Sequence, residues 1–248
     1  MTHLYYGDPN TSFSDRLAEG LFSSGADMLE MGIAYSDPVA DGEVFQKACK
    51  RALDGGTNPY MVFKGIKKLR EKGFKQPIYV TSYFGPVYKI GVSKFLYLVK
   101  NSGAQGVIIP DILFEEKKEL QNSANKLRLN VIQFATPYST NERLIKILKN
   151  AQGFVYCMAV PGVTGVRQDV SKEIEALVKR VKRFTNLPVY VGFGISKHEH
   201  VKNILSMGAD GVIVGSAIGK IYEKYLDNPE KSLPEIVSFT KSLKGGTI

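Results

Sequence analysis

Three short stretches decide the fold of this chain: Ser24-Gly25-Ala26-Asp27-Met28-Leu29, Ser102-Gly103-Ala104-Gln105-Gly106-Val107-Ile108 and Met207-Gly208-Ala209-Asp210-Gly211-Val212-Ile213. In each, a glycine ends a helical pattern, where a C-terminal cap needs a positive φ, and an apolar strand follows. The glycines stand at positions 25, 103 and 208. The length of chain between Gly25 and Gly103 fits two βα units, and the length between Gly103 and Gly208 fits four. The sequence therefore predicts a repeated βα pattern.

Strand-like runs and amphipathic helices alternate between and around these stretches. Eight apolar runs are predicted as strands, at residues 4–6, 27–31, 78–82, 106–109, 131–134, 154–158, 189–191 and 211–214. Helical patterns separate them, among them residues 115–127, 142–148, 172–184 and 198–207. An α/β fold is expected, a single (β/α)8 TIM barrel forming one domain over residues 1–248. An open doubly wound sheet is the competing arrangement, and eight regular repeats favour closure.

The composition is that of an ordinary globular protein with an excess of positive charge. Hydrophobic residues make up 44%, charged residues 23%, and the formal net charge is +9. The basic residues recur at helical spacings, which is typical of solvated helix faces, and a positive surface favours an anionic, phosphorylated substrate. A basic stripe interleaved with aromatic residues is absent from the sequence, so we expect no nucleic-acid partner.

Location and metal content are constrained by what the sequence lacks. No signal-peptide pattern is visible at the start, and no apolar run approaches the roughly 20 residues that span a bilayer. Two cysteines, Cys49 and Cys157, are too few for a disulfide framework. We therefore expect a cytoplasmic protein without membrane contact, with Cys157 in the core. His3, His198 and His200 form no metal-ligand pattern, and the last two are expected at a helix start.

A second stretch, residues 28–48, carries two acids in unlike settings. It reads Met-Leu-Glu-Met-Gly-Ile-Ala-Tyr-Ser-Asp-Pro-Val-Ala-Asp-Gly-Glu-Val-Phe-Gln-Lys-Ala. Glu30 lies in an apolar run, which raises a carboxyl pKa and suits it to proton transfer, whereas Asp41 lies on a wetter loop. Such a pair is a common way to run acid and base chemistry in one site. Asp37 and Asp41 are alternatively turn or N-cap residues, and Glu30 a solvated or ion-paired strand end.

This second stretch resembles the signature of the tryptophan synthase α chain. The usual form is Leu-Glu-Leu-Gly-hydrophobic-Pro-aromatic-Ser-Asp-Pro-x-Ala-Asp-Gly-Pro. Ala34 and Glu43 each stand where the family usually has proline. Both differences free φ, so they affect the conformation of the loop rather than the identity of the acids.

Glycines follow each of the last two predicted strands. The sequences are Gly192-Phe193-Gly194-Ile195-Ser196 and Gly215-Ser216-Ala217-Ile218. In a barrel of this class these two loops commonly bind phosphate through backbone N–H groups and a helix N-terminus. The alternative is that the glycines only serve tight turns. Both loops resemble the family's phosphate loops, which implies phosphate contacts from Gly192, Phe193, Gly194, Gly215 and Ser216.

The loop after the sixth predicted strand reads Val160-Pro161-Gly162-Val163-Thr164-Gly165-Val166. Two glycines around a threonine indicate a lid that closes over a site, with an ordinary surface loop as the alternative. The loop resembles the family's sixth loop, which implies that Thr164 meets Asp41 on closure and that Thr164 and Gly165 contact substrate. The family more often has polar residues at the positions of Val160 and Pro161.

Aromatic and aliphatic residues complete the resemblance. Tyr83 and Tyr156 match the family's indole-pocket tyrosines, and Ile108 and Thr81 match further pocket positions. Thr81 is polar where the family typically has an aliphatic residue. Without the resemblance, single aromatic residues on strands are expected in the core.

The resemblance covers almost the whole chain and implies a lyase of tryptophan biosynthesis. The reaction is retro-aldol cleavage of indole-3-glycerol phosphate to indole and glyceraldehyde 3-phosphate, with Glu30 handling protons and Asp41 stabilising charge at the ring N–H. It implies no metal or cofactor in this chain, and a partner tryptophan synthase β chain that holds pyridoxal phosphate in an α2β2-type complex. Two alternatives stay open: another phosphate-binding barrel enzyme of the same pathway, and a weakly active barrel that regulates a β chain.

Overall fold

Parallel strands form the inner wall of the molecule in the computed structural model, which describes residues 1–158, 167–192 and 194–247. Their order is β1-β2-β3-β4-β5 in one sheet and β6-β7-β8-β9 in the other. The strands are β1 (Thr2–Tyr5), β2 (Leu29–Gly32), β3 (Ile78–Thr81), β4 (Gly106–Ile108), β5 (Asn130–Val131), β6 (Gln133–Ala135), β7 (Val155–Met158), β8 (Val189–Gly192) and β9 (Gly211–Ile213).

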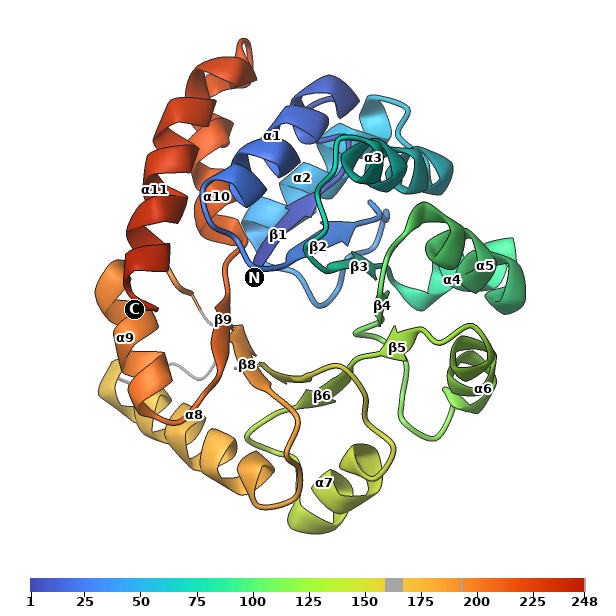
Figure 1. Cartoon of the computed structure of the whole chain (residues 1–248), viewed down its shortest axis with the longest axis vertical. Helices are drawn as coiled ribbons and strands as arrows, with labels where there is room; N and C mark the ends of the chain where they lie inside the picture. Colours follow the sequence, from blue (N-terminus) through green and yellow to red (C-terminus); the bar gives the residue numbers. More distant parts are fainter. Residues whose placement is uncertain (159–166, 193, 248) are drawn as a thin grey trace.

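The two sheets join into one ring (Figure 1). Only Ile132 separates β5 from β6, and its N–H donates to Val107 on β4 at 3.0 Å, so the two segments occupy one strand position. At the other junction Thr2 forms a parallel bridge with Val214, and the His3 N–H donates to the Val214 carbonyl at 2.8 Å. The fold is therefore the predicted (β/α)8 barrel.

Helices cover the outside of this ring (Figure 1). They are α1 (Thr11–Ser23), α2 (Glu43–Asp54), α3 (Pro59–Glu71), α4 (Phe84–Ile90), α5 (Val92–Ser102), α6 (Lys118–Lys126), α7 (Asn141–Leu148), α8 (Arg167–Lys182), α9 (His198–Ser206), α10 (Ser216–Tyr222) and α11 (Leu233–Gly245), with 3-10 turns at Glu223–Tyr225 and Pro229–Ser232. Asn10, Asn58 and Thr140 accept N–H groups of the first turns of α1, α3 and α7, which explains where those helices begin. None of the helices in the described ranges has the length and apolar character needed to cross a membrane.

The predicted junctions are confirmed, and several element boundaries are corrected. Gly25, Gly103 and Gly208 have φ of 103°, 89° and 95°. The strand predicted at 27–31 is Leu29–Gly32, the run predicted at 131–134 is divided into β5 and β6, and the helix predicted at 172–184 is Arg167–Lys182. The first strand begins two residues earlier than predicted, because Thr2 pairs with Leu29. The helix predicted from residue 115 begins three residues later, because residues 114–117 form turns with an i to i+3 hydrogen bond instead.

Two layers of apolar side chains follow from the alternation along the strands. The larger core lies between strands and helices and includes Cys157, which is 1% exposed, as predicted. A smaller cluster fills the inside of the barrel and consists of Tyr79, Ile108, Ile132, Phe154 and Ile213. Because all strands are parallel, their carboxyl ends open onto one rim, where this fold places its active sites.

Candidate active site

Two adjoining cavities open at the carboxyl ends of the strands. The larger has a volume of ≈ 480 Å³ and the smaller ≈ 100 Å³. Both are lined by His3, Ala40, Asp41, Phe45, Tyr156 and Met158. A ligand that occupies both cavities therefore passes these six residues.

Glu30 projects from β2 into the smaller cavity. It is 2% exposed, and its Oε1 accepts a hydrogen bond of 2.6 Å from the hydroxyl of Thr81 on the neighbouring strand. Among the described residues its Oε2 has no hydrogen-bond partner. Burial raises the pKa of Glu30 to about 7, and the Thr81 hydrogen bond opposes this rise. The direction is the one predicted from the apolar run, and it keeps a large protonated fraction near neutral pH.

Asp41 is half-buried, lines the same smaller cavity as Glu30 and is held by two tyrosines. Its Oδ2 accepts hydrogen bonds from Tyr5 at 2.6 Å and from Tyr83 at 2.7 Å. The Tyr83 hydroxyl in turn accepts the Ala40 N–H at 3.0 Å, which ties the loop to the end of β3. The N-cap of α2 is Gly42, without a side-chain bond, so the Asp41 carboxylate is not the cap of that helix.

The predicted pocket residues come together around the smaller cavity. Tyr83, Ile108 and Tyr156 line it together with Thr81 and Phe134. The ring centroids of Phe134 and Tyr156 lie 5.0 Å apart. Burial, with the charges of Glu30 and Asp41, raises the pKa of Tyr156 well above its usual value, so its hydroxyl stays protonated. The result is an apolar wall with two carboxyl groups on one side.

The predicted phosphate residues that the structure describes line the larger cavity. They are Gly192, Gly194, Gly215 and Ser216. Helix α10 begins at Ser216. The Ile218 and Gly219 N–H groups donate to the Gly215 carbonyl, so those of Ser216 and Ala217 are the ones without an acceptor in the helix. Lys220, one turn later, also lines the cavity and supplies positive charge.

Gly192, Gly194 and Gly215 differ in what surrounds the position that a Cβ atom would occupy. A Cβ on Gly192 would lie 2.7 Å from the Tyr156 ring, and one on Gly215 would lie 2.5 Å from the Phe45 ring. At Gly194 no atom lies within 4 Å of such a Cβ, although φ is +41°. Packing alone accounts for the first two glycines, and only Gly194 borders open space.

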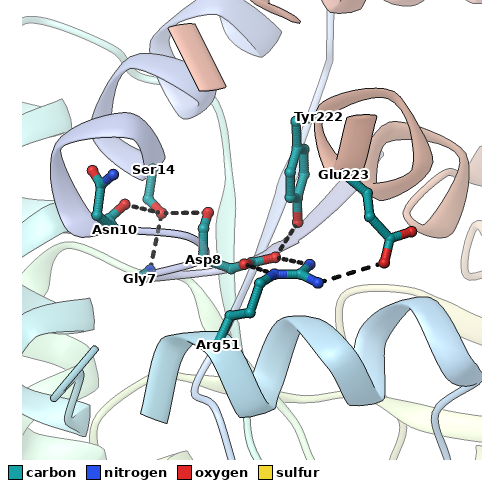
Figure 2. A network of polar contacts seen from close by, with 7 residues as sticks. All are labelled: Gly7, Asp8, Asn10, Ser14, Arg51, Tyr222 and Glu223. Atoms are coloured by element: carbon teal, nitrogen blue, oxygen red, sulfur yellow. Dashed lines mark hydrogen bonds and ion pairs between the residues drawn. The ribbon is translucent and has the colours of Figure 1, made fainter. Parts of the chain in front are cut away.

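A buried network fixes the helices that carry the site (Figure 2). Asp8, which follows β1, accepts hydrogen bonds from Arg51 on α2 and from Tyr222 at the end of α10. Arg51 also lies 3.5 Å from Glu223. The Asp41 loop leads into α2 and the glycine loop leads into α10, so one carboxylate links both ends of the site.

Several predicted site residues cannot be placed, and several residues that line the cavities were not predicted from the sequence. Thr164, Gly165 and Phe193, with Val160 and Pro161, lie outside the described residues. His3, Phe45 and Lys220 were not singled out for this site from the sequence. His3 alternates with Tyr5 on β1, and that period of two could have placed both side chains inside the barrel.

No group of three or more histidine, cysteine, aspartate or glutamate side chains gathers as a metal site in the described ranges. The chemistry available is that of a buried acid with a raised pKa beside a hydrogen-bonded carboxylate. Such a pair can transfer protons at one atom of a ligand and stabilise positive charge at another.

Comparison with known proteins gives one consistent result. The family model described as tryptophan synthase alpha chain matches residues 1–247. The tryptophan synthase alpha chain of Methanocaldococcus jannaschii is 46% identical over 221 residues, covering 89% of this chain and 78% of the relative. The tryptophan synthase alpha chain of Arabidopsis thaliana is 39% identical over 242 residues, covering 98% of this chain and 87% of the relative.

Solved structures agree with these relatives. The tryptophan synthase A-subunit of the hyperthermophile Pyrococcus furiosus superimposes with a TM-score of 0.90 at 33% identity, covering 98% of this chain and 96% of that one. A chain of the tryptophan synthase complex of the same organism gives a TM-score of 0.89 at 32% identity, covering 98% and 96%.

Proposed function

The chain belongs to the tryptophan synthase alpha chain family, and we propose that its two cavities cleave indole-3-glycerol phosphate to indole and glyceraldehyde 3-phosphate. It is a lyase of tryptophan biosynthesis, and the bond that it breaks is a carbon–carbon bond. One observation carries the assignment. Glu30 is a buried acid whose Oε2 has no hydrogen-bond partner among the described residues, and it lines the smaller, apolar cavity that adjoins the glycine-lined one.

The reaction needs protons moved at two atoms, because indole is a poor carbanion leaving group. Protonating the indole carbon at the scissile bond gives an indolenine, which accepts the bond electrons when the neighbouring glycerol hydroxyl loses its proton. Glu30 handles these protons, with its pKa of about 7 near the working pH. Asp41 stabilises positive charge at the ring N–H, and its tyrosine hydrogen bonds hold it in place.

The rest of the substrate is oriented by the cavity walls. Tyr83, Ile108 and Tyr156 contact the indole ring, while Gly194, Ser216 and their neighbours in the larger cavity bind the phosphate. Phosphate binding far from the reacting atoms supplies energy that orients them. By family resemblance Thr164, Gly165 and Phe193 join these contacts.

A tryptophan synthase β chain is the partner of this chain, and pyridoxal phosphate belongs to the β chain. Large apolar side chains are exposed on segments that follow strands at the carboxyl-end rim: Val39 (80%), Tyr88 (76%) and Leu113 (59%). Exposed apolar groups on one rim mark a protein-binding surface. The β chain docks there in an α2β2-type complex, in the cytoplasm, against an α chain that forms one barrel domain.

Indole release from indole-3-glycerol phosphate, measured with and without a β chain, tests the function. Glu30→Gln should lower kcat by ~10²–10⁴-fold because an amide cannot exchange the proton. Glu71→Gln, an exposed position on α3, is the control and should match the wild type. If Glu30→Gln retains most of its kcat, Glu30 does not transfer the protons. If the wild type releases no indole yet stimulates a β chain, the chain is a regulatory barrel.

A further inference from the structure

His3 stands where the two cavities meet. It projects inward from β1 and lines both cavities, and its side chain is 8% exposed. The ring is held between Phe45 and Tyr5, with centroid distances of 4.5 and 5.0 Å. In a ligand that reaches from the apolar pocket to the glycine loops, the middle part, which joins the two ends, therefore lies beside the imidazole.

The imidazole forms a pair with Glu30. His3 Nδ1 lies 3.5 Å from Glu30 Oε1, the oxygen that also accepts the Thr81 hydroxyl. The other two polar atoms of the pair, His3 Nε2 and Glu30 Oε2, are buried and have no hydrogen-bond partner among the described residues. The space beside Nε2 is kept open by Gly32, whose Cβ would lie 3.1 Å from that nitrogen.

Unpartnered atoms of this kind call for an explanation. A buried polar atom without a partner has lost its hydrogen bonds to water without replacement, so native proteins keep few of them. Here two occur on adjacent side chains in the cavity that receives the substrate. In the tautomer with its proton on Nδ1, 3.5 Å from Glu30 Oε1, the imidazole has a free lone pair on Nε2, and the protonated Glu30 can carry its acid proton on Oε2. One side chain can then accept a proton while the other donates one.

We propose that His3 and Glu30 divide the two proton transfers of the cleavage. Glu30 Oε2 delivers its proton to the indole carbon at the scissile bond, and His3 Nε2 takes the proton of the neighbouring glycerol hydroxyl. The O–H electron pair becomes the second bond of the aldehyde, and the C–C pair returns to the indole ring. This inference rests on the proposed function, and it assigns to His3 a role that the Glu30 carboxyl otherwise performs alone.

The pair is also able to reset. After cleavage Glu30 is a carboxylate and His3 an imidazolium, so one proton has moved from the acid to the base. The imidazolium returns a proton from Nδ1 across the 3.5 Å to Oε1, and exchange with water after product release restores the starting tautomer. No oxidant, reductant or further reactant is needed.

The electrostatics of the cavity place both groups in the required states. Burial lowers the pKa of His3 to about 4, and the Asp41 charge opposes this, so the imidazole is neutral at pH 7. Burial raises the pKa of Glu30 to about 7, so its acid form is present. The other titratable groups that line the two cavities or face the pair are Tyr5, Tyr83, Tyr156, Glu43, Lys220 and the amino group of Met1. Burial raises the pKa of the three tyrosines, so they stay neutral, and it lowers the pKa of the Met1 amino group to about 6.

Substitution of His3 in the full chain tests the proposal. His3→Asn keeps an amide near the position of Nδ1 but offers no base, and His3→Ala leaves space for free imidazole. Both should lower kcat for indole release by ~10²-fold. Added imidazole should restore the His3→Ala enzyme at least tenfold. His198→Asn, on α9 against α11, is the matched control and should match the wild type.

Two further measurements separate a proton-transfer role from a packing role. An indole phosphate analogue without glycerol hydroxyls should bind both His3 variants within threefold of the wild type. The wild-type kcat should fall as pH rises through about 7 and again as pH falls towards 4, and His3→Asn should lose only the acidic limb.

Each remaining outcome decides against the proposal in a different way. If either His3 variant keeps the wild-type kcat, His3 takes no proton. If imidazole fails to restore His3→Ala, or analogue binding is lost with activity, His3 acts through packing and the proposal is overturned. If Glu30→Gln is inactive while His3 variants are not, the proposed function stands and this inference falls. If the wild type cleaves nothing, both fall together.

Discussion

Arg51 and Asp8 are joined by two parallel hydrogen bonds, from Nε to Oδ1 at 2.7 Å and from Nη2 to Oδ2 at 2.9 Å. The residues are far apart in sequence, and Asp8 is 1% exposed. Tyr222 adds a third donor to the same carboxylate at 2.6 Å (Figure 2). A buried carboxylate is tolerated because three donors replace its water, and the same contacts hold α2 and α10 in register with β1.

Arg51→Met should therefore lower the free energy of unfolding by ~3–5 kcal/mol, because it leaves the Asp8 charge buried without its cation. Lys50→Met removes the neighbouring basic residue, whose exposed pair with Asp54 should contribute no more than ~0.5 kcal/mol. Urea unfolding of both variants measures the difference. Equal losses would mean that the Arg51–Asp8 pair does not stabilise the fold.

The buried acid makes stability depend on pH. The pKa of Glu30 rises from 4.5 to about 7 on folding, so the folded state binds the proton more tightly. The stability that this proton contributes is present below pH 4.5 and is lost as pH rises through about 7, a change of about 3 kcal/mol. Glu30→Gln cannot titrate. It should gain about this amount relative to the wild type between pH 4.5 and 8, measured by urea unfolding at several pH values.

Glu71→Gln controls for the general pH dependence, since residue 71 is exposed and its replacement should leave the unfolding curve unchanged at every pH. A Glu30→Gln enzyme whose stability follows that of the wild type across this range would contradict the raised pKa.

Gly194 should determine phosphate affinity. Gly194→Ala adds a methyl group into open space on the cavity wall, where it limits how closely a phosphate approaches the backbone. We expect KM for indole-3-glycerol phosphate to rise about tenfold, about 1.4 kcal/mol, with kcat within twofold. KM for a dephosphorylated analogue should not change. Steady-state kinetics with both substrates measure this.

Gly73→Ala is the matched control for Gly194→Ala. Gly73 also has a positive φ, 88°, and open space around its Cβ position, but it lies between α3 and β3 at the amino end of the strands. Gly73→Ala should also carry the strain of an alanine at positive φ, but without a change in KM. Equal increases in KM at both positions would indicate strain alone and remove the phosphate assignment.

Tyr88 should contribute to binding of the β chain. It is 76% exposed on α4, directly after β3, and Tyr88→Ser should weaken the complex about tenfold by removing a large apolar contact at the rim. Tyr97→Ser is the control, because this residue is 57% exposed but lies on the outer helix α5. Calorimetric titration of each variant with a β chain compares the two. A larger loss for Tyr97→Ser would place the docking surface elsewhere.

The sequence by itself predicted the order of strands and helices, the glycines that end the helices and the direction of the Glu30 pKa shift. The φ values of Gly25, Gly103 and Gly208 follow from short-range chemistry, since a glycine that caps a helix needs no distant contact. The apolar run around Glu30 predicted the direction of its pKa shift, but the cause is burial inside the barrel, since Leu29 and Met31 pack in the outer core on the other face of the strand. The alternation of side chains between the two faces of a strand also depends only on neighbouring residues.

Only the tertiary structure decided how the ends of the chain close the barrel and which atoms meet inside it. The bridge from Thr2 to Val214, the pair of His3 with Glu30 and the packing of Phe45 on Gly215 all depend on register between distant strands. A shift of one residue in any strand would turn these side chains to the other face. Register is set by the sum of contacts around the whole ring, which no single stretch of sequence contains.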